Sequence, residues 1–345
     1  MIKHPARYRV PVAASRKGCE HASMKVLVIH SRDLDKGSTR FRVVNYVPYL
    51  QSQGISVDFV NRKEVTAAQA REHDVVLNQK CRIGWWTART LRRASQRLLF
   101  DFDDAIYTRP RKPYGPVVGN RVRRRLDWWL AAADLVTTSS DYLAGYARRI
   151  TDRIRVIPMA VDVDTWHPSP RAADDRIRIG WAGRPGNLRF LRAIEAPLAS
   201  LLRARPNVSF AVYSGESPDM AVPMEHTPFH AGTEAAFCQS LDIGLLPLDD
   251  TAFTRGKSPI KAIQYLACGV PVVGNIIGAG REIVTNDVGL DVSDHGGWLD
   301  ALIQLVDNAA LRRQLGDAGR ARIVARHNLA TSSTLLLDAI TGNRS

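Results

Sequence analysis

No stretch of this chain stays apolar for long. Its longest apolar runs are strand-length segments such as residues 26–29. A helix that crosses a membrane needs about 20 consecutive apolar residues. Residues 1–23 are basic and polar and contain no apolar core, which argues against a secretory signal. We therefore expect a cytoplasmic protein without membrane-spanning helices, in which residues 1–23 form a disordered basic extension.

Cysteine is also scarce. The four cysteines of the 345-residue chain are widely scattered and form no CxxC pair. This spacing indicates neither a disulfide framework nor a zinc site, and it fits a reducing compartment. The first expected strand is not followed by a G-x-G-x-x-G motif, which disfavours a dinucleotide-dependent oxidoreductase. We expect no cofactor and no metal ion.

Acidic residues are outnumbered. The chain has 34 Asp and Glu residues against 48 Lys and Arg residues, which gives a formal net charge of +14. Such a charge indicates anionic partners, whether nucleic acids, acidic lipids or phosphorylated substrates. Charge alone does not choose among them, and most of these side chains are expected to lie on a solvated surface.

Short apolar runs alternate with helical periodicity along most of the chain. Residues 25–30 (KVLVIH) predict a strand buried on both faces of a parallel sheet, and residues 40–53 predict a helix that ends before Gly54. Repeated strand–helix units predict an α/β fold with doubly wound parallel sheets. The other strands are expected at residues 55–60, 74–77, 97–102, 135–138, 154–158, 177–182, 208–213, 243–247 and 270–274.

A stretch rich in proline, charge and small residues at 167–175 (HPSPRAADD) marks a domain boundary. We expect an N-terminal Rossmann-like domain at residues 24–168 and a C-terminal one at 169–330, with a cleft between them. A helix or tail at 331–345 follows, and its return to the N-terminal domain stays open. Ligands of open α/β sheets bind beyond the carboxyl ends of the strands, so loops that follow strands are the candidate sites.

The strongest motif lies at residues 256–274 (GKSPIKAIQYLACGVPVVG). A basic turn runs into an amphipathic helix, and Gly269 ends this helix before an apolar strand. The amide donors and the positive dipole end of the helix lie beside Lys257, Ser258 and Lys261, which favours a diphosphate ligand. For the bare pattern, the alternative is an ordinary helix-to-strand connection.

This motif resembles the donor site of the group 1 glycosyltransferases of GT-B architecture. The resemblance implies two Rossmann-like domains and a nucleotide-sugar donor. It also implies that Lys257, Ser258 and Lys261 face the donor diphosphate and that Gln264 faces the ribose. Many members of the family have Glu at both Gly256 and Gln264, so the chain departs from the pattern at these two positions.

Two further motifs match the same family. Residues 179–190 (IGWAGRPGNLRF) present Arg184 and Arg189 at the start of a helix, where the resemblance implies that they grip the donor phosphates. Two cations there would oppose the charge that grows on a leaving diphosphate. Residues 278–284 (GAGREIV) resemble the family's Gly-rich turn, which implies that Gly280 and Glu282 lie near the donor sugar. Surface arginines beside a turn are the alternative for the first motif.

The acceptor side is expected in the N-terminal half, at residues 36–42 (KGSTRFR) after the first strand. Gly37 permits a close approach, and Ser38 and Arg40 offer hydrogen-bond donors beside the cleft. A helix cap formed by Ser38 or Thr39 is the alternative, and the two interpretations are compatible.

Residues 98–107 (LLFDFDDAIY) place three carboxylates at the end of a buried strand. Asp103 and Asp104 are the candidate catalytic residues, because either could orient or deprotonate an acceptor hydroxyl. Asp101 and Asp103 form a D-x-D pair, which binds a divalent metal in another glycosyltransferase fold. We reject that interpretation because lysine and arginine are expected to balance the diphosphate. Carboxylates that cap the next turn are the structural alternative.

A basic segment at residues 109–129 ends in two tryptophans. Basic residues followed by aromatic ones on a helix predict a surface that docks on an anionic membrane. Nucleic-acid binding and a solvated helix with buried tryptophans are the alternatives. The residues expected to dock are Arg121, Arg123, Arg124, Arg125, Trp128 and Trp129.

The sequence therefore predicts a cytoplasmic glycosyltransferase, with a peripheral position on the inner face of the plasma membrane as one option. The expected partners are a nucleotide-sugar donor, a saccharide or lipid-linked acceptor and an anionic membrane surface, and no nucleic acid is expected. The resemblance implies a retaining, metal-independent transfer in cell-surface polysaccharide or glycolipid biosynthesis. A GT-B sugar-nucleotide epimerase and a non-enzymatic nucleic-acid-binding protein are the alternatives.

Overall fold

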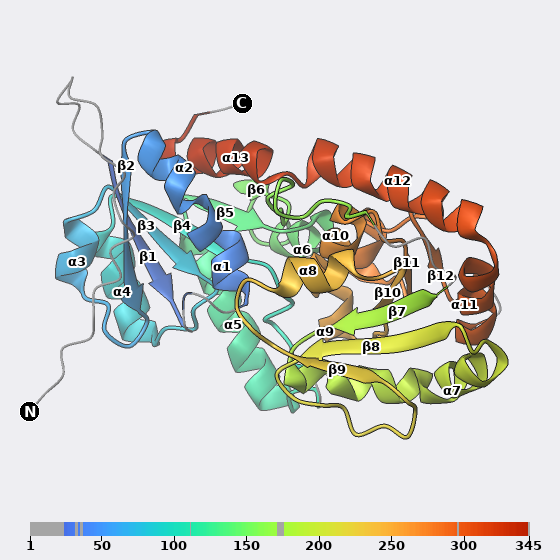
Figure 1. Ribbon diagram of the computed structural model, residues 1–345. Helices are drawn as coiled ribbons and strands as arrows, with labels where there is room; N and C mark the ends of the chain where they lie inside the picture. The colour runs from blue at the N-terminus through green and yellow to red at the C-terminus, as the bar shows by residue number, and fades with distance from the viewer. Residues whose placement is uncertain are drawn as a thin grey trace, which may run out of the picture.

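Two α/β domains lie side by side in the computed structural model of the protein (Figure 1). The structure describes residues 24–31, 34, 37–110, 112–170, 176–294 and 297–343. The extension expected at residues 1–23, and residues 171–175 of the expected boundary, lie outside the described residues.

The N-terminal domain is built on one parallel sheet of six strands in the order β2-β1-β3-β4-β5-β6. The alternation of the sequence predicts all six to within about two residues at each end, because their apolar runs are buried on both faces. The strands are β1 (Met24–His30), β2 (Ile55–Asn61), β3 (Val75–Gln79), β4 (Arg97–Phe102), β5 (Leu135–Thr138) and β6 (Ile154–Val156).

The helix expected at residues 40–53 is divided in three. It consists of α1 (Ser38–Arg42), a 3-10 turn η1 (Val44–Tyr46) and α2 (Val47–Ser52). Pro48 has no N–H to donate within a continuous helix, and it lies instead in the first turn of α2, where none is needed. The other helices of this domain are α3 (Ala67–Arg71), α4 (Trp85–Ala94), α5 (Pro116–Ala132) and α6 (Asp141–Ala147).

The C-terminal domain has a second six-stranded parallel sheet, in the order β12-β11-β10-β7-β8-β9. Four strands match the sequence prediction, whereas β9 and β12 were not predicted. β9 has the sequence EHTP and is mostly exposed, so it carries no apolar signal. The strands are β7 (Ile177–Ala182), β8 (Val208–Ser214), β9 (Glu225–Pro228), β10 (Ile243–Leu246), β11 (Val272–Gly274) and β12 (Gly289–Asp291).

The helices of the C-terminal domain cover both faces of this sheet. The helix expected at about residues 188–203 begins as a 3-10 segment, η2 (Pro185–Ile194), and continues as α7 (Glu195–Ala204). The helix of the strongest motif is α10, and it spans Ile260–Ala267. The remaining elements are α8 (Glu234–Gln239), α9 (Ala252–Arg255), η3 (Gly278–Glu282), α11 (Trp298–Asp307) and α12 (Ala309–Arg326).

The last helix, α13 (Leu329–Thr341), returns to the N-terminal domain (Figure 1). Its Leu336 and Ile340 belong to the same apolar cluster as Val28 of β1. Just before α13, Asn328 forms a parallel bridge with Val161, which lies on the first connection between the domains. The two connections are therefore paired, and we expect any relative motion of the domains to pivot there.

No helix among the described residues combines the length and the apolar character that a membrane span requires. α12, with 18 residues, is interrupted by charged side chains along its length. α5 has 17 residues and carries four arginines.

Candidate active site

The predicted cleft falls where the strand order of each sheet reverses. In the N-terminal sheet that point is between β1 and β3, and in the C-terminal sheet it is between β7 and β10. Ligands of doubly wound sheets bind at such points. The loops from the two sheets touch here, since a Cβ atom added at Gly37 would lie 3.2 Å from Nη1 of Arg184. The expected acceptor-side loop and the expected donor-side loop thus face each other.

The start of α10 brings a lysine pair and an aromatic ring together. Lys257 lies in the turn before the helix, with its Nζ 5.1 Å from the centre of the Phe190 ring, and Lys261 lies in the first turn. Burial, together with the like charges of Arg189 and Lys261, lowers the pKa of Lys257 to about 8, although the carboxylates of Asp104 and Asp249 oppose this shift. Cations that are crowded in this way gain most from an anionic ligand.

The two arginines of the η2 loop differ in their surroundings. Arg189 donates to the Asp249 carboxylate at 3.1 Å and to the carbonyl of Pro110 in the N-terminal domain at 2.9 Å, and it also stacks on Phe190. Arg184 precedes η2 and is exposed. Arg189 is therefore already fixed in place, whereas Arg184 is accessible at the edge of the cleft.

Gln264 and Ser258 hold polar atoms without partners. The Gln264 side chain is fully buried on α10, and neither its Oε1 nor its Nε2 has a hydrogen-bond partner. The Ser258 hydroxyl is also buried and unpaired. Leaving such a group unsatisfied costs about 1–3 kcal/mol, so both atoms would gain from a bound hydroxyl or phosphate.

Gly256 marks the departure from the family motif, and the structure explains it. A Cβ atom at this position would lie 2.7 Å from Cβ of Ala105 and 3.1 Å from Cδ2 of Leu143. Both neighbours belong to the N-terminal domain, which packs directly against the donor-side turn. A glutamate at Gly256 would therefore clash.

On the N-terminal side, Lys80 joins the two candidate catalytic carboxylates. Its Nζ lies 2.7 Å from Asp103 Oδ1 and 2.6 Å from Asp104 Oδ2. The Asp103 side chain is 1% exposed and that of Asp104 is 27% exposed, so Asp104 is the carboxylate that a substrate can reach. Geometry thus separates two residues that the sequence left equivalent.

The two carboxylates also differ in charge state. Burial raises the pKa of Asp103 to about 6, although Lys80 opposes this effect. Burial likewise raises the pKa of Asp104, but the attraction of Lys80, with Lys257 of the other domain and the Ser258 amide, outweighs it and leaves the pKa below its ordinary value. Asp104 is therefore ionised at neutral pH and lies close to the donor-side lysine.

Lys80 was not predicted from the sequence. It follows the buried strand β3 directly, as Asp103 follows β4, and that position at a strand's carboxyl end was a usable signal. Its φ of 44° is positive, and among the described residues it is the one non-glycine with this feature. Backbone strain of this kind gathers at functional sites, which supports a role for Lys80 in the cleft.

Replacing Lys80 with Met should move the acidic limb of the pH profile of turnover to higher pH. The lysine lowers the pKa of Asp104, so its removal lets the carboxylate take up a proton at higher pH. Turnover measured from pH 5 to 9 tests this, with folding checked by circular dichroism. Lys80→Arg should restore the profile, and an unshifted limb in Lys80→Met would refute the role.

Asp101 faces away from this group. Its carboxylate receives two donors from Arg42, with Nη2 at 2.5 Å, and the Thr137 hydroxyl at 2.7 Å. Arg42 and Asp101 are both buried, so they form a structural ion pair beneath the cleft. The two members of the D-x-D pair therefore have different partners, Arg42 for Asp101 and Lys80 for Asp103. Among the described residues no group of three His, Cys, Asp or Glu side chains is suited to a metal.

The acceptor-side loop holds the domains together. Arg40 forms an ion pair of 2.5 Å with Glu234 of α8 in the C-terminal domain. Ser38 begins α1, but no side chain caps this helix, and Thr39 donates to Gln79 at 3.0 Å instead. The alternative interpretation, a helix cap formed by Ser38 or Thr39, is therefore wrong, because Gly37 occupies the cap position.

The Gly-rich turn contacts the N-terminal domain. The Glu282 carboxylate accepts the backbone N–H groups of Asp141 and Tyr142 at 3.0 and 2.8 Å, so it caps α6 of the N-terminal domain. The expected place of Glu282 near the donor sugar stays a prediction. Gly280 is buried in η3. The glycine that the turn requires is Gly278, because φ is +50° and a Cβ atom would overlap the Arg255 carbonyl.

The basic segment forms α5, and its tryptophans do not face outward as expected. Trp129 is 1% exposed and stacks on Phe100 at 5.7 Å between ring centres. Trp128 is half-buried between Trp129 and Trp85. The helix turns this side toward the sheet, so the predicted docking role of Trp128 and Trp129 is wrong. Arg121, Arg123 and Arg124 are exposed, and Arg125 is half-buried.

Sequence comparison finds glycosyltransferases. The chain is 31% identical over 173 residues to a GDP-mannose-dependent alpha-(1-6)-phosphatidylinositol dimannoside mannosyltransferase of Mycobacterium tuberculosis, which is 42% of either chain. It is 25% identical over 246 residues to a D-inositol 3-phosphate glycosyltransferase of Xylanimonas cellulosilytica, covering 61% of this chain and 56% of the relative. The chain thus spans about half the length of these curated relatives. No family model matches the sequence.

Solved structures share the fold. A glycosyltransferase from Rickettsia africae superposes with a TM-score of 0.70 at 14% identity, over 94% of this chain and 100% of that one. The Anabaena protein HepE, solved with UDP and glucose, superposes with a TM-score of 0.68 at 14% identity, over 92% of this chain and 100% of that one. These findings confirm the predicted GT-B architecture and the resemblance to glycosyltransferases.

Proposed function

We propose that the protein transfers a sugar from a nucleotide-sugar donor, bound at the start of α10, to an acceptor held by the N-terminal domain. One observation carries this proposal. The donor-side cations of the C-terminal domain lie opposite the Asp103–Asp104 pair of the N-terminal domain. The sequence relatives are glycosyltransferases, and HepE was solved with UDP and glucose, which supports the same chemistry. The donor-side cations are Arg184, Arg189, Lys257 and Lys261.

The donor diphosphate would lie at the amino end of α10. Lys257, Ser258 and Lys261 would bind its oxygens, and Gln264 would supply its unpaired amide to the ribose. Arg184, which is exposed at the edge of the cleft, would close on the phosphates as negative charge grows on the leaving group. Gly280 would let the turn approach the sugar.

The acceptor hydroxyl would be oriented by Asp104. This carboxylate is ionised, is reachable from the cleft and is held by Lys80. Asp103 is buried, so it would act through Lys80 and position Asp104. Gly37, Ser38 and Arg40 would border the acceptor. We propose retention of configuration, with a donor phosphate oxygen taking the acceptor proton, and the anomeric coupling of the product in NMR spectra would test it.

Turnover should persist in EDTA. Lysine and arginine side chains balance the diphosphate charge in this proposal, and Asp101 is already paired with Arg42. Initial rates with and without chelator should agree within about twofold. Loss of activity that Mn²⁺ or Mg²⁺ restores would revive a metal role for the carboxylates.

The acceptor is proposed to be a saccharide or a lipid-linked saccharide on a cytoplasmic membrane surface. One sequence relative is named for a phosphatidylinositol dimannoside and another for inositol 3-phosphate, which supports glycolipid or surface polysaccharide synthesis. The test is release of nucleoside diphosphate from a panel of nucleotide sugars, with and without a bacterial lipid extract. Release from one sugar nucleotide that requires the extract supports transfer. An isomerised sugar nucleotide would indicate an epimerase instead.

A further inference from the structure

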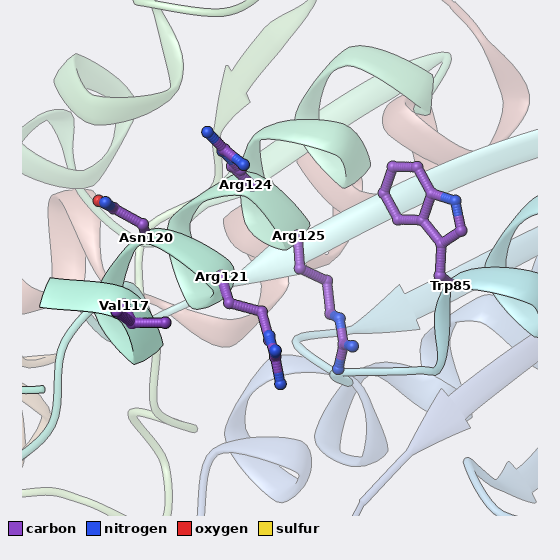
Figure 2. A pocket seen from close by; sticks show the side chains of 6 residues that line it. All are labelled: Trp85, Val117, Asn120, Arg121, Arg124 and Arg125. Atoms are coloured by element: carbon purple, nitrogen blue, oxygen red, sulfur yellow. The ribbon is translucent and has the colours of Figure 1, made fainter. Parts of the chain in front are cut away.

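A hollow on the N-terminal domain lies outside the cleft described above (Figure 2). It is formed by the first turn of α4 and by the exposed side of α5. Figure 2 shows Arg121 and Arg125 extending in the same direction from α5, with Trp85 across from them on α4. The residues that line it are Trp85, Val117, Asn120, Arg121, Arg124 and Arg125.

The arginines of the hollow lack acidic partners. Within the part of the chain that the structure describes, Arg121, Arg124 and Arg125 form no ion pair. The neighbouring Arg123 donates a hydrogen bond to the Asn120 side chain at 2.6 Å. Three arginines without acidic partners therefore line one hollow. An anion with several oxygens, such as a phosphate ester, matches their donors.

An apolar rim accompanies the hollow, made of Val117, which lines it, and of Trp86 and Val118, the chain neighbours of Trp85 and Val117. Trp86 is 79% exposed, Val117 is 76% exposed and Val118 is 52% exposed. They lie in the first turns of α4 and α5. Large apolar side chains that cluster beside unpaired cations mark an interaction surface rather than ordinary solvent-facing helix.

The tryptophans below make this surface rigid. Trp85 packs on Trp128 at 5.4 Å between ring centres, Trp128 packs on Trp129 at 5.1 Å, and Trp129 stacks on Phe100 of β4. A row of aromatic rings thus runs from the hollow to the core. Trp128 and Trp129 support this surface from beneath, whereas Trp85 lines the hollow itself.

The surface lies on the catalytic side of the domain. α4 follows β3 and α5 follows β4, so the first turns of both helices lie beyond the carboxyl edge that carries Lys80 and Asp104. Arg82 donates to the Tyr114 hydroxyl at 2.9 Å, which ties the loop after β3 to the residues that precede α5. A partner held in the hollow would be next to the acceptor side of the cleft.

We propose that this hollow binds the phosphate head groups of anionic lipids, while Trp86, Val117 and Val118 enter the boundary between head groups and acyl chains. Arginines supply the attraction to phosphate, and the aliphatic rim fits acyl chains. A nucleic acid would use the arginines and a tryptophan but would leave the two valines without a role. This inference rests on the proposed function, since it places the acceptor-side domain where a lipid-linked acceptor occurs.

Co-sedimentation of the full chain with vesicles tests the proposal. The parent should bind vesicles that contain phosphatidylglycerol and ignore pure phosphatidylcholine. Changing Arg121, Arg124 and Arg125 together to Gln should weaken binding roughly 100-fold, which is the loss expected when three basic residues leave an anionic surface. Val117→Ser with Val118→Ser should reduce the part of the binding that survives high salt, because salt screens only the arginines.

A charge-matched control separates this hollow from the general positive charge of the chain. Exposed arginines of the C-terminal domain, Arg203, Arg313 and Arg326, changed together to Gln remove the same charge and should leave vesicle binding unchanged. Equal loss in the control, an unaffected valine variant, or a parent that binds RNA but not vesicles would overturn the proposal. Calorimetric donor binding by the same variants should match the parent. Vesicle binding without any donor binding would count against the proposed function alone.

Discussion

Asp104→Asn should lower turnover by roughly 10²–10⁴-fold while leaving donor affinity unchanged or stronger. The carboxylate is the reachable member of the pair with Lys80, and its removal takes away the group that orients the acceptor hydroxyl. It also removes a negative charge that lies near Lys257 and competes with the diphosphate. Steady-state rates and calorimetric donor binding on one preparation would separate the two effects.

Asp127→Asn provides the matched control. Asp127 lies on α5, accepts from the Tyr146 hydroxyl at 3.1 Å and is half-buried in the same domain. We expect this variant to keep the parent rate. If Asp104→Asn instead binds the donor much more weakly and turns over normally at saturating donor, Asp104 belongs to the donor site and not to the acceptor site.

Lys257→Ala and Lys261→Ala should each weaken nucleotide-sugar binding by roughly 10- to 150-fold, the range for a lost hydrogen bond to a charged group. Both lysines flank the start of α10. Among the described residues of the C-terminal domain, no acidic side chain forms an ion pair with either lysine. Isothermal calorimetry with the donor measures the effect. Lys63→Ala, which changes an exposed lysine of the other domain, should bind like the parent.

The pH dependence of donor binding gives a second check on Lys257. Its pKa in the free protein is lowered to about 8, so the side chain loses its charge as the pH rises through that value. Donor affinity should therefore fall above about pH 8 in the parent. Lys257→Arg should bind the donor without this fall, because arginine stays protonated. An identical decline in Lys257→Arg would assign the dependence to another group.

The parallel strands and α10 could be predicted from the sequence because each depends on local pattern. β4, β5 and β7 are apolar runs between polar residues, and burial on both faces leaves no other arrangement for them. The local sequence also marks where the donor-side helix begins and ends, with Lys257 in the turn before it and Gly269 just after it. β9 was missed because its four residues are held by pairing with β8 and not by their own apolar character.

Features that depend on contacts between distant segments could not be predicted. Glu282 caps α6 from the other domain, and Gly256 is fixed by Ala105, neither of which has a signal in the local sequence. The burial of Trp129 depends on which side of α5 meets β4. The role of Lys80 could not be predicted for the same reason, because it depends on Asp103 and Asp104, which lie 23 and 24 positions further along the chain.

Thermal unfolding with a panel of nucleotide sugars tests the central claim most directly. A ligand that binds only the folded state stabilises it by about 2.7 kcal/mol at a concentration of 100 Kd. One nucleotide sugar, together with its nucleoside diphosphate, should raise the melting temperature of the parent by several degrees and that of Lys257→Ala by much less. If no nucleotide sugar raises it, or if Lys257→Ala is stabilised as strongly as the parent, the donor site at α10 is wrong.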